Sequence, residues 1–580
     1  MDIRRTVLWV VFSLALLMLW DKWQQYNGRP PMLFPGMSEQ VKSAADTTLG
    51  AGKGTAAGAN AGASPSTGNA TPAATAAAIG AATAGTAVSG ETITITTDVF
   101  KADIDTAGGK LKRLELLKHK EGVIGQWYDP FLELVGLKKK ASMDKNVVLF
   151  DNTTTRTYLA ETGLIGGAFP NHKSIFTARP GARTPDATGA VQLILEAEQG
   201  GVKLIKTLSF KNGDYHIGIK HDIVNTSAAA VSPSLYEQLV RDGSKPLGES
   251  SFYSTFTGPA VYTDADKFQK LDFEKIEKGT EEHARKSDGG WVAVIQHYFV
   301  SALVLPAKMP REIFTKKVDT NLYAVGSIVP LGSIAAGAST SVDTQLYSGP
   351  QESAVLEQTA AGLELVKDYG WLTIIAKPIF WLMTQIQKIL GNWGWTIIVL
   401  TVLIKLAFFP LSAASYRSMA KMKLVTPKMT TIRERFKGDP QKMNQAMMEL
   451  YKTEKINPLG GCLPIVVQIP VFISLYWVLL ASVEIRNAPW LGWIQDLAAP
   501  DPFFILPVIM AVSMFIQTSL NPTPPDPMQA QVMKFMPIIF SVMFFFFPSG
   551  LVLYWVVNNV LSITQQYVIT KQFEPKTAPA

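Results

Sequence analysis

One lysine stands inside a long apolar stretch near the C-terminal third of the chain. Lys405 belongs to the run 393–411, and it is the only ionisable side chain well inside such a run. A charged group in an apolar segment of membrane-spanning length is costly, so it marks a functional position or a side chain that reaches the lipid headgroups. Two interpretations follow. Lys405 faces a water-filled cavity among helices, where it could attract anionic groups, or its stem carries the ammonium to the membrane surface.

Polar side chains recur at helical spacing in the neighbouring apolar stretches. Thr401 lies one helical turn before Lys405 and therefore on the same helical face. The other candidates belong to three later stretches and are Gln468, Gln517, Tyr554, Trp555, Asn558 and Ser562. Side chains of this kind form hydrogen bonds between membrane helices, and together with an unpaired lysine they could line a hydrophilic groove. The sequence leaves both interpretations open.

Groups that carry covalent chemistry are scarce in this chain. It has one cysteine, Cys462, and six histidines, all before residue 300 and without ligand spacing. An intramolecular disulfide is therefore excluded, and a metal site is not expected. From residue 371 onward there is no histidine and no intramembrane acid pair, so a serine–base constellation is not expected either. We expect no enzyme activity, no catalytic residue and no cofactor.

The segment 413–460 predicts a basic helical hairpin. It contains ten Lys or Arg residues against four Asp or Glu residues. Gly438, Asp439 and Pro440 supply a helix end, an N-cap and a first-turn proline in that order. The excess of positive charge between apolar spans places the hairpin in the cytoplasm and makes specific nucleic-acid binding the weaker interpretation. Its methionines either pack the two helices together or form an adaptable surface that captures apolar segments of other proteins. They are Met419, Met422, Met429, Met443 and Met447.

The apolar stretches predict six transmembrane spans. Residues 1–26 combine Arg4 and Arg5 with an apolar run, which is the pattern of a signal anchor. Five further spans are expected at 393–411, 462–482, 502–520, 533–548 and 550–570. The region 350–391 is expected to lie at the membrane interface, because its helix is amphipathic. The predicted apolar face consists of Trp371, Ile375, Ile379, Leu382, Ile386 and Ile389. With six spans, both termini lie in the cytoplasm.

A linker and a β-rich domain are expected between the anchor and the interfacial region. Residues 27–90 are dominated by Ala, Gly, Thr and Ser, a composition that predicts a flexible linker. In residues 91–349 apolar and polar side chains alternate, as in Thr92–Thr96, which predicts half-buried strands. Glycine and asparagine residues between these runs suit hairpin turns. We therefore expect a large antiparallel β-sandwich on the outer side of the membrane.

Several short motifs give the chain a specific resemblance. They are Gly391-Asn392-Trp393-Gly394-Trp395, Met419-Ala420-Lys421-Met422 with Pro427-Lys428, Asn457-Pro458-Leu459-Gly460-Gly461-Cys462, Pro548-Ser549-Gly550-Leu551 and Gln565-Gln566. In these motifs, and in its order of anchor, β-rich segment and apolar spans, the whole chain resembles the YidC/Oxa/Alb family of membrane protein insertases. The resemblance is to the Gram-negative form, which carries a large periplasmic domain.

The resemblance implies a fold and an activity. It implies a polytopic α-helical membrane protein whose residues 392–580 form a five-helix core, with a hydrophilic groove open to cytoplasm and lipid and closed to the periplasm. Lys405 matches the single basic groove residue of the family, which is usually arginine, so the charge is kept while bidentate geometry is lost. Tyr554 and Trp555 match its substrate-contacting aromatic pair. The implied function is insertion and folding of integral membrane proteins, alone or with the Sec translocon.

Partners and location follow from the same resemblance. It implies nascent integral membrane proteins, membrane lipids and the Sec translocon (SecYEG and SecDF) as partners, with the ribosome and the signal recognition particle as candidates. The expected location is the bacterial inner membrane, with residues 91–349 in the periplasm. One alternative belongs to another class: an ion or solute transporter or channel with an anion site at Lys405. The absence of Asp, Glu and His from the predicted spans for proton relay argues against it.

Overall fold

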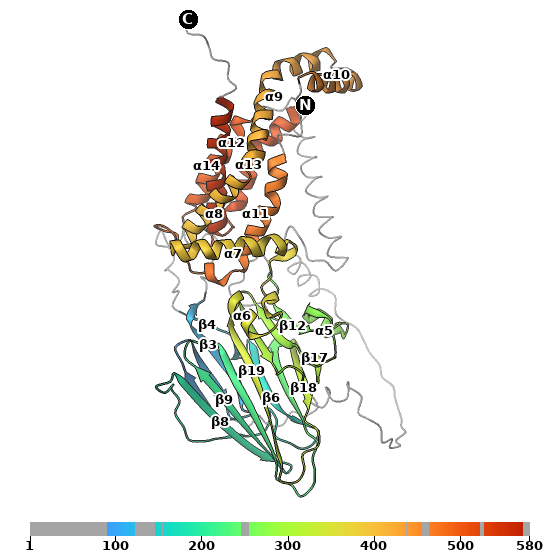
Figure 1. Ribbon diagram of the computed structural model, residues 1–580, viewed down its shortest axis with the longest axis vertical. Helices are drawn as coiled ribbons and strands as arrows, with labels where there is room; N and C mark the ends of the chain where they lie inside the picture. The colour runs from blue at the N-terminus through green and yellow to red at the C-terminus, as the bar shows by residue number, and fades with distance from the viewer. Residues whose placement is uncertain are drawn as a thin grey trace, which may run out of the picture. The chain divides into compact units, whose positions relative to one another are not determined.

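Two compact units make up the part of the chain that the computed structural model describes (Figure 1). The described residues are 90–121, 145–153, 155–244, 255–436, 438–454, 463–521 and 527–571. A β-rich unit comprises the described residues up to Lys367, and a helical unit begins at Asp368. The predicted anchor 1–26, the predicted linker up to residue 89, Cys462 and the residues after Lys571 lie outside the described residues.

Within the described residues, the β-rich unit consists of two antiparallel sheets. The first contains β1 (Thr92–Thr96), β2 (Phe100–Asp105), β3 (Lys110–Lys120), β4 (Asn146–Val148), β5 (Asp151–Asn152), β6 (Thr157–Ile165), β11 (Ser234–Asp242), β14 (Lys286–Ser287), β17 (Arg311–Asp319) and β18 (Leu322–Pro330). Its main order is β1-β2-β3-β6-β11-β18-β17-β14, with β4 beside β3 and β5 beside β6.

The second sheet contains β7 (Thr177–Ala178), β8 (Ala190–Gln199), β9 (Val202–Lys211), β10 (His216–Asn225), β12 (Gly258–Thr263), β13 (Lys267–Lys270), β15 (Trp291–Gln296), β16 (Phe299–Val304) and β19 (Ser339–Pro350). Its order is β13-β12-β15-β16-β19-β10-β9-β8-β7. In the register of its centre, Ile219 on β10 is paired with Thr344 on β19 and with Leu208 on β9.

Alternation of side chains along the strands builds the core of this unit. In β8, β9 and β10, buried residues alternate with more exposed ones, because successive side chains of a strand point to opposite faces. The inward apolar residues of both sheets form one cluster, which includes Ile95, Phe100, Leu204 and Leu235. The prediction of a large antiparallel β domain is confirmed.

Polar groups cross this core from one sheet to the other. The Lys206 ammonium on β9 donates to the carbonyl oxygens of Gly108 and Thr162, both at 2.9 Å. Thr344 Oγ1 on β19 donates to Glu237 Oε1 on β11 at 2.6 Å. Burial lowers the pKa of Lys206 to about 7 and raises the pKa of Glu237 to about 7. The two sheets are thus linked by buried polar groups whose charged forms are disfavoured by their surroundings.

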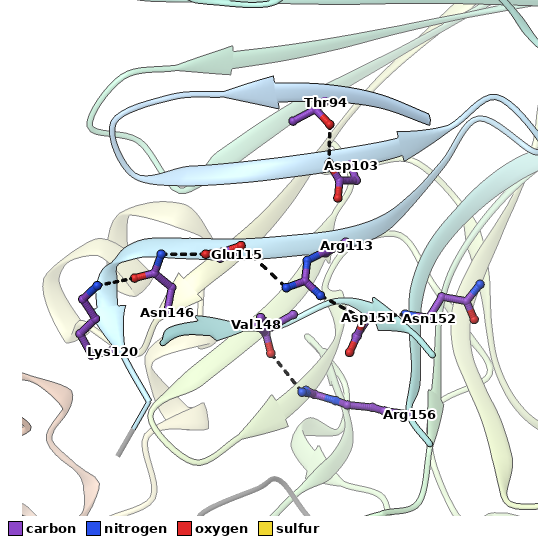
Figure 2. Close-up of polar contacts among 10 residues, drawn as sticks. All are labelled: Thr94, Asp103, Arg113, Glu115, Lys120, Asn146, Val148, Asp151, Asn152 and Arg156. Carbon is purple, nitrogen blue, oxygen red and sulfur yellow. Dashed lines mark hydrogen bonds and ion pairs between the residues drawn. The ribbon is translucent and has the colours of Figure 1, made fainter. Parts of the chain in front are cut away.

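A side-chain hydrogen bond and an ion pair attach the short strands β4 and β5 to β3 in the first sheet (Figure 2). Asn146 Nδ2 on β4 donates to Glu115 Oε1 on β3 at 2.7 Å. Arg113 Nη1 on β3 lies 3.4 Å from Asp151 Oδ1 on β5. Because β4 and β5 contain only three and two residues, they form few ladder bonds, and these side chains add to what the backbone supplies.

The helical unit is built from α7 (Thr373–Leu390), α8 (Trp393–Ala407), α9 (Phe409–Arg435), α10 (Pro440–Thr453), α11 (Leu463–Ala481), α12 (Ile505–Leu520), α13 (Pro527–Phe544) and α14 (Ser549–Lys571). Helix α14 packs against α8, α9, α11 and α12. Buried side chains of α8, α11, α12 and α14 form one cluster, which includes Leu400, Leu475, Met510 and Leu551. The prediction of a helical C-terminal region is confirmed.

Helices α8, α11, α12, α13 and α14 overlap the five spans expected after residue 392. Among the described residues, however, no single helix reaches both the length and the hydropathy of a membrane span. Helices α8 and α9 reach them only as a pair, which is bent by 66° at their junction. The helical hairpin is present as α9 and α10, with Asp439 as the N-cap of α10, where its side chain accepts from Lys442 N at 3.1 Å.

The region 350–391 was expected to be one interfacial segment, but it is divided between the two units. Helix α6 (Ser353–Thr359) and the 3₁₀ helix Leu363–Val366 belong to the β-rich unit, which also contains the short helix α5 (Phe273–Lys278). Leu356 and Leu363 are buried there in a cluster with Trp291. The 3₁₀ helix Gly370–Leu372 and α7 belong to the helical unit.

The buried face of α7 overlaps the predicted apolar face in part, since Ile386 is buried and Ile379 and Leu382 pack against the same cluster. The helix buries Ala376, Phe380, Met383 and Ile386, whereas Ile389, predicted on the apolar face, is 85% exposed. α7 packs against both α8 and α11, and the small Ala376 side chain permits close approach. The helix is apolar on more than one face, so periodicity alone could not identify the side that packs.

We expect Lys206→Met to destabilise the β-rich unit by about 1–3 kcal/mol, because two buried carbonyl oxygens lose their donor. The loss should be smallest near pH 7 and should widen toward pH 9. Between the folded pKa of about 7 and the ordinary value of 10.5, the unfolded chain holds a proton that the folded chain releases, so the wild type gains stability as the pH rises.

Hydrogen exchange of β6 and β9 in the full-length protein, corrected for intrinsic pH dependence, measures this difference. Lys203→Met is the matched control, since Lys203 lies on the other face of β9 and pairs with Glu196 at 2.7 Å. Equal pH profiles for the two variants would contradict the assignment of the effect to the buried ammonium.

Candidate functional site

Lys405 is joined to the last helix of the unit. Its helix α8 is capped by Asn392, whose side chain accepts from Gly394 N and Trp395 N. Lys405 lies twelve residues after Trp393, near the other end of α8. Its Nζ donates to Ser562 Oγ on α14 at 2.7 Å. In the described part of the chain, no carboxylate pairs with this ammonium. A positive charge is therefore held between α8 and α14 without neutralisation by a described residue.

A second polar contact links α14 to α11. Gln468 Nε2 on α11 donates to Asn558 Oδ1 on α14, and the Ser562 hydroxyl donates to the Asn558 carbonyl oxygen at 2.7 Å. Ser562, Asn558 and Gln468 therefore continue from Lys405 across α14 to α11. The structure thus brings together four of the residues predicted from the sequence, and two interhelical hydrogen bonds join them.

Aromatic side chains pack beside these polar groups. Tyr554 is 1% exposed, and its ring centroid lies 6.3 Å from that of Phe472 on α11. The Trp555 ring meets Phe472 edge to face at 4.5 Å and lies 5.3 Å from Phe544 on α13. The predicted pair is therefore packed among three helices. Phe472 and Phe544 gave no signal in the sequence, because one phenylalanine in an apolar run resembles any other.

Thr401 and Gln517 are placed differently. Thr401 is buried, and its hydroxyl donates to the Ile397 carbonyl oxygen within α8 at 2.6 Å. Gln517 on α12 is half-buried, and among the described residues it forms no hydrogen bond with the other candidates. The contact between α12 and α14 is instead made by Asn559 Nδ2, which donates to Ser513 Oγ at 3.0 Å. Neither Asn559 nor Ser513 was among the groove residues predicted from the sequence.

The hairpin methionines divide into two groups. Met429 is 2% exposed and packs with Val425, and Met422 and Met447 border this small core between α9 and α10. Lys428 and Glu454 join the same two helices through an ion pair at 2.6 Å. For these three methionines the packing interpretation is confirmed.

The other two methionines, Met419 and Met443, are only half-buried. Met448, which was not among the predicted capture residues, is 56% exposed.

No group of three or more His, Cys, Asp and Glu side chains that could hold a metal occurs within the residues that the structure describes. What the site offers is one positive charge, hydrogen-bonding amides and hydroxyls, and packed aromatic rings.

Comparison with known proteins matches nearly the whole chain. A family model described as 60Kd inner membrane protein matches residues 385–576, and one described as YidC periplasmic domain matches residues 92–382. A membrane protein insertase YidC from Janthinobacterium sp. (strain Marseille) is 63% identical over 99% of both chains. Another, from Cupriavidus taiwanensis, is 56% identical over 98% of both. The match to a solved structure of an active YidC insertase covers 83% of this chain and 93% of that chain, at 16% sequence identity and a TM-score of 0.38.

The two family matches together define an inner-membrane protein with a periplasmic domain. At 63% identity over its full length, the chain belongs to the YidC family of membrane protein insertases. It is thus an insertase and not an enzyme. The predicted family, function and inner-membrane location are confirmed.

We expect Met429→Ala to weaken the hairpin, because truncating a buried methionine costs about 2–5 kcal/mol. Met448→Ala should leave hairpin stability within about 0.5 kcal/mol of wild type, since that side chain is largely exposed. Hydrogen exchange of α9 and α10 measures both. Equal protection in the two variants would contradict the packing role assigned to Met429.

Proposed function

We propose that this protein inserts and folds integral membrane proteins in the inner membrane through a cytoplasm-open hydrophilic groove beside Lys405. The single observation that carries the proposal is the ammonium of Lys405, which lies between α8 and α14 with a serine hydroxyl as its partner. A positive charge held by a neutral group keeps most of its attraction for an acidic flank of a client protein. The proposed groove residues are those of the site: Lys405, Thr401, Gln468, Gln517, Tyr554, Trp555, Asn558 and Ser562.

The proposed mechanism divides the work between a polar and an apolar step. The polar flank of a client enters the groove part-way across the bilayer, which shortens its passage through hydrocarbon. Its apolar segment of about 20 residues then partitions into lipid, and that burial supplies the driving force. Covalent chemistry is not required at any step.

The hairpin is proposed to make the first contact with the client. Met422, Met429 and Met447 contribute to the small core of the hairpin, so we assign capture to Met419 and Met443, which do not belong to that core, and to the exposed Met448. Thioether side chains adapt to apolar segments of varied shape.

The proposed topology has six spans. The segment 1–26 and helices α8, α11, α12, α13 and α14 cross the membrane, and both termini and the hairpin lie in the cytoplasm. Helix α7 lies at the periplasmic interface, because its exposed face combines Ile374 and Trp381 with Lys377. Such a mixture of apolar, aromatic and basic side chains suits the boundary between lipid and water.

The proposed partners are nascent membrane proteins, membrane lipids and the Sec translocon, with the ribosome and the signal recognition particle as further candidates. The alternative function, a transporter or channel with an anion site at Lys405, rests on the same unneutralised charge. The two proposals differ in their product. Client insertion into liposomes without sustained ion flux supports the insertase mechanism, whereas ion flux that depends on Lys405 and needs no client supports the alternative.

We expect opposite accessibility for cysteines placed in the hairpin and in the β-rich unit. In a background that carries Cys462→Ser, an impermeant thiol reagent added to intact spheroplasts should label Ser341→Cys and should not label Thr430→Cys. Both positions are exposed, so burial does not explain a difference. Equal labelling in intact and permeabilised cells at both sites would refute the proposed topology.

Substitutions of Lys405 should separate charge from structure. Lys405→Arg should retain insertion, while Lys405→Ala should slow clients with acidic N-terminal flanks, and Lys405→Glu should slow them further, by roughly tenfold, through repulsion. Ser562→Ala is the matched control, because it removes the hydrogen bond but leaves the charge. Insertion rates in liposomes, compared for acidic and neutral flanks, measure the effect. Full activity of Lys405→Leu toward acidic flanks would leave the groove charge without a role.

A further inference from the structure

A layer of polar side chains crosses the core of the β-rich unit. In the first sheet, Glu237 of β11 lies between Thr162 of β6 and Ser327 of β18, since these residues are paired in register. In the second sheet, His221 of β10 is paired with Lys206 of β9. All five side chains are buried. The apolar core is therefore interrupted by a layer that contains three titratable groups.

His221 and Glu237 face each other between the sheets without a direct hydrogen bond. His221 Nδ1 lies 3.8 Å from Glu237 Oε1, which is beyond hydrogen-bond distance. His221 Nε2 forms a hydrogen bond with Thr162 Oγ1 at 3.0 Å, and Glu237 Oε1 accepts from Thr344 Oγ1 at 2.6 Å. Both hydrogen bonds run from one sheet to the other. The two side chains thus join the sheets through separate, uncharged partners.

Neither side chain has surroundings that would stabilise its charged form. Within the described residues, Glu237 Oε2 has no hydrogen-bond partner, whereas an ionised carboxylate is stabilised by several donors. His221 is 0% exposed, and Lys206 repels an imidazolium. Burial is the main cause that raises the pKa of Glu237 to about 7 and lowers the pKa of His221 to about 3. The geometry therefore indicates a neutral acid beside a neutral imidazole, and not an ion pair.

Three other charged groups act on these two side chains. Lys206 of β9 and Arg311 of β17 favour the ionised form of Glu237, but burial outweighs both. Asp222 of β10 favours the protonated form of His221, and burial and Lys206 oppose it. The neighbouring side chains from β6, β18 and β19 carry no charge and are Thr162, Ser327 and Thr344. In mildly acidic solution the surroundings thus keep both groups neutral.

We propose that Glu237 and His221 form a proton-compensating pair, in which the carboxylate takes up a proton on folding while the imidazolium releases one. In mildly acidic solution the unfolded chain carries an ionised Glu237 and a protonated His221, whereas both are uncharged in the folded chain. One N–H bond breaks and one O–H bond forms, so the number of bound protons is unchanged. Because the pH dependence of stability follows the difference in bound protons, the pair makes the β-rich unit tolerant of acid. The inference does not depend on the proposed insertion mechanism.

The two groups act on stability in opposite directions. The pKa of Glu237 rises from 4.5 to about 7, so this group stabilises the folded chain as the pH falls through that range. The pKa of His221 falls from 6.5 to about 3, so this group destabilises the folded chain as the pH falls. The ranges overlap between pH 4.5 and pH 6.5, where the effects oppose each other. Lys206, with a pKa of about 7, is mainly protonated there in both states.

Hydrogen exchange of single and double variants tests this compensation. In the full-length protein, the slowest amides of β10 and β11, corrected for intrinsic exchange rates, give the unfolding equilibrium constant of the unit. From about pH 6 to about pH 5, Glu237→Gln should raise this constant roughly fivefold to tenfold relative to wild type, because only the imidazole effect remains. His221→Gln should lower it by a similar factor, and the double variant should follow the wild-type profile.

Glu196→Gln is the matched control. Glu196 on β8 pairs with Lys203 at 2.7 Å, and this hydrogen bond lowers the pKa of the carboxyl, so Glu196 is mainly ionised in both states at these pH values. The control should keep the wild-type profile. A wild-type profile for folded Glu237→Gln or for folded His221→Gln would overturn the proposal.

The sign of the effect on stability separates the neutral pair from an ion pair. Glutamine has the shape of a protonated glutamic acid, so Glu237→Gln should be more stable than wild type at about pH 6, because folding no longer requires protonation of a carboxylate. His221→Gln should be more stable than wild type at about pH 5 for the corresponding reason, and it provides the same test if Glu237→Gln does not fold. Destabilisation by both variants would indicate an ion pair and would overturn the proposal.

Infrared spectra test the protonation state of the wild type directly. At about pH 6, the carbonyl band of a protonated carboxylic acid should be present in wild type and weaker in Glu237→Gln, because folded Glu237 carries its proton at this pH. Equal bands in the two proteins would show that Glu237 is ionised, and the proposal would fail.

Discussion

Inside an apolar bundle, a polar group has to find its partner within the protein, because no solvent is present to supply one. This constraint accounts for the position of α14. The helix provides Ser562 for Lys405 of α8, Asn558 for Gln468 of α11 and Asn559 for Ser513 of α12. One helix therefore satisfies the polar side chains of three neighbours, which is why it packs at the centre of the unit. Among the described residues no carboxylate pairs with Lys405, and its ammonium lies where we propose that the acidic flank of a client binds.

The β-rich unit meets the same constraint in another way. Its interior also holds a lysine, but Lys206 donates to two backbone carbonyl oxygens, and Glu237 receives a threonine hydroxyl. Both groups have pKa values shifted toward neutrality by burial. Lys206 is fully enclosed between two sheets, whereas Lys405 is only partly buried between helices. The first lysine thus serves the packing of the sheets, while the second is the group that we propose attracts a client.

Much of this architecture could be predicted from the sequence, because periodicity and charge act locally. Alternation revealed the strands, and the Asp439–Pro440 pair revealed the start of α10. The packing face of α7 could not be predicted, since it depends on α8 and α11, which lie elsewhere in the chain. The same holds for the roles of Met422, Met429 and Met447, which are fixed by contact with the other helix of the hairpin. The folded segment between α11 and α12, residues 482–504, was not predicted, because hydrogen bonds to distant parts of the chain order it. Only the motifs that it contacts, around Gly394 and Gly550, were recognised in the sequence.

The bend between α8 and α9 has a mechanical consequence. Helix α9 continues for 27 residues beyond Phe408, which makes it an arm about 40 Å long at 1.5 Å per residue. A rotation of about 10° at its base would sweep its far end through about 7 Å. The junction lies three residues after Lys405, so the position of α10 depends strongly on the angle between two helices that meet next to the candidate site.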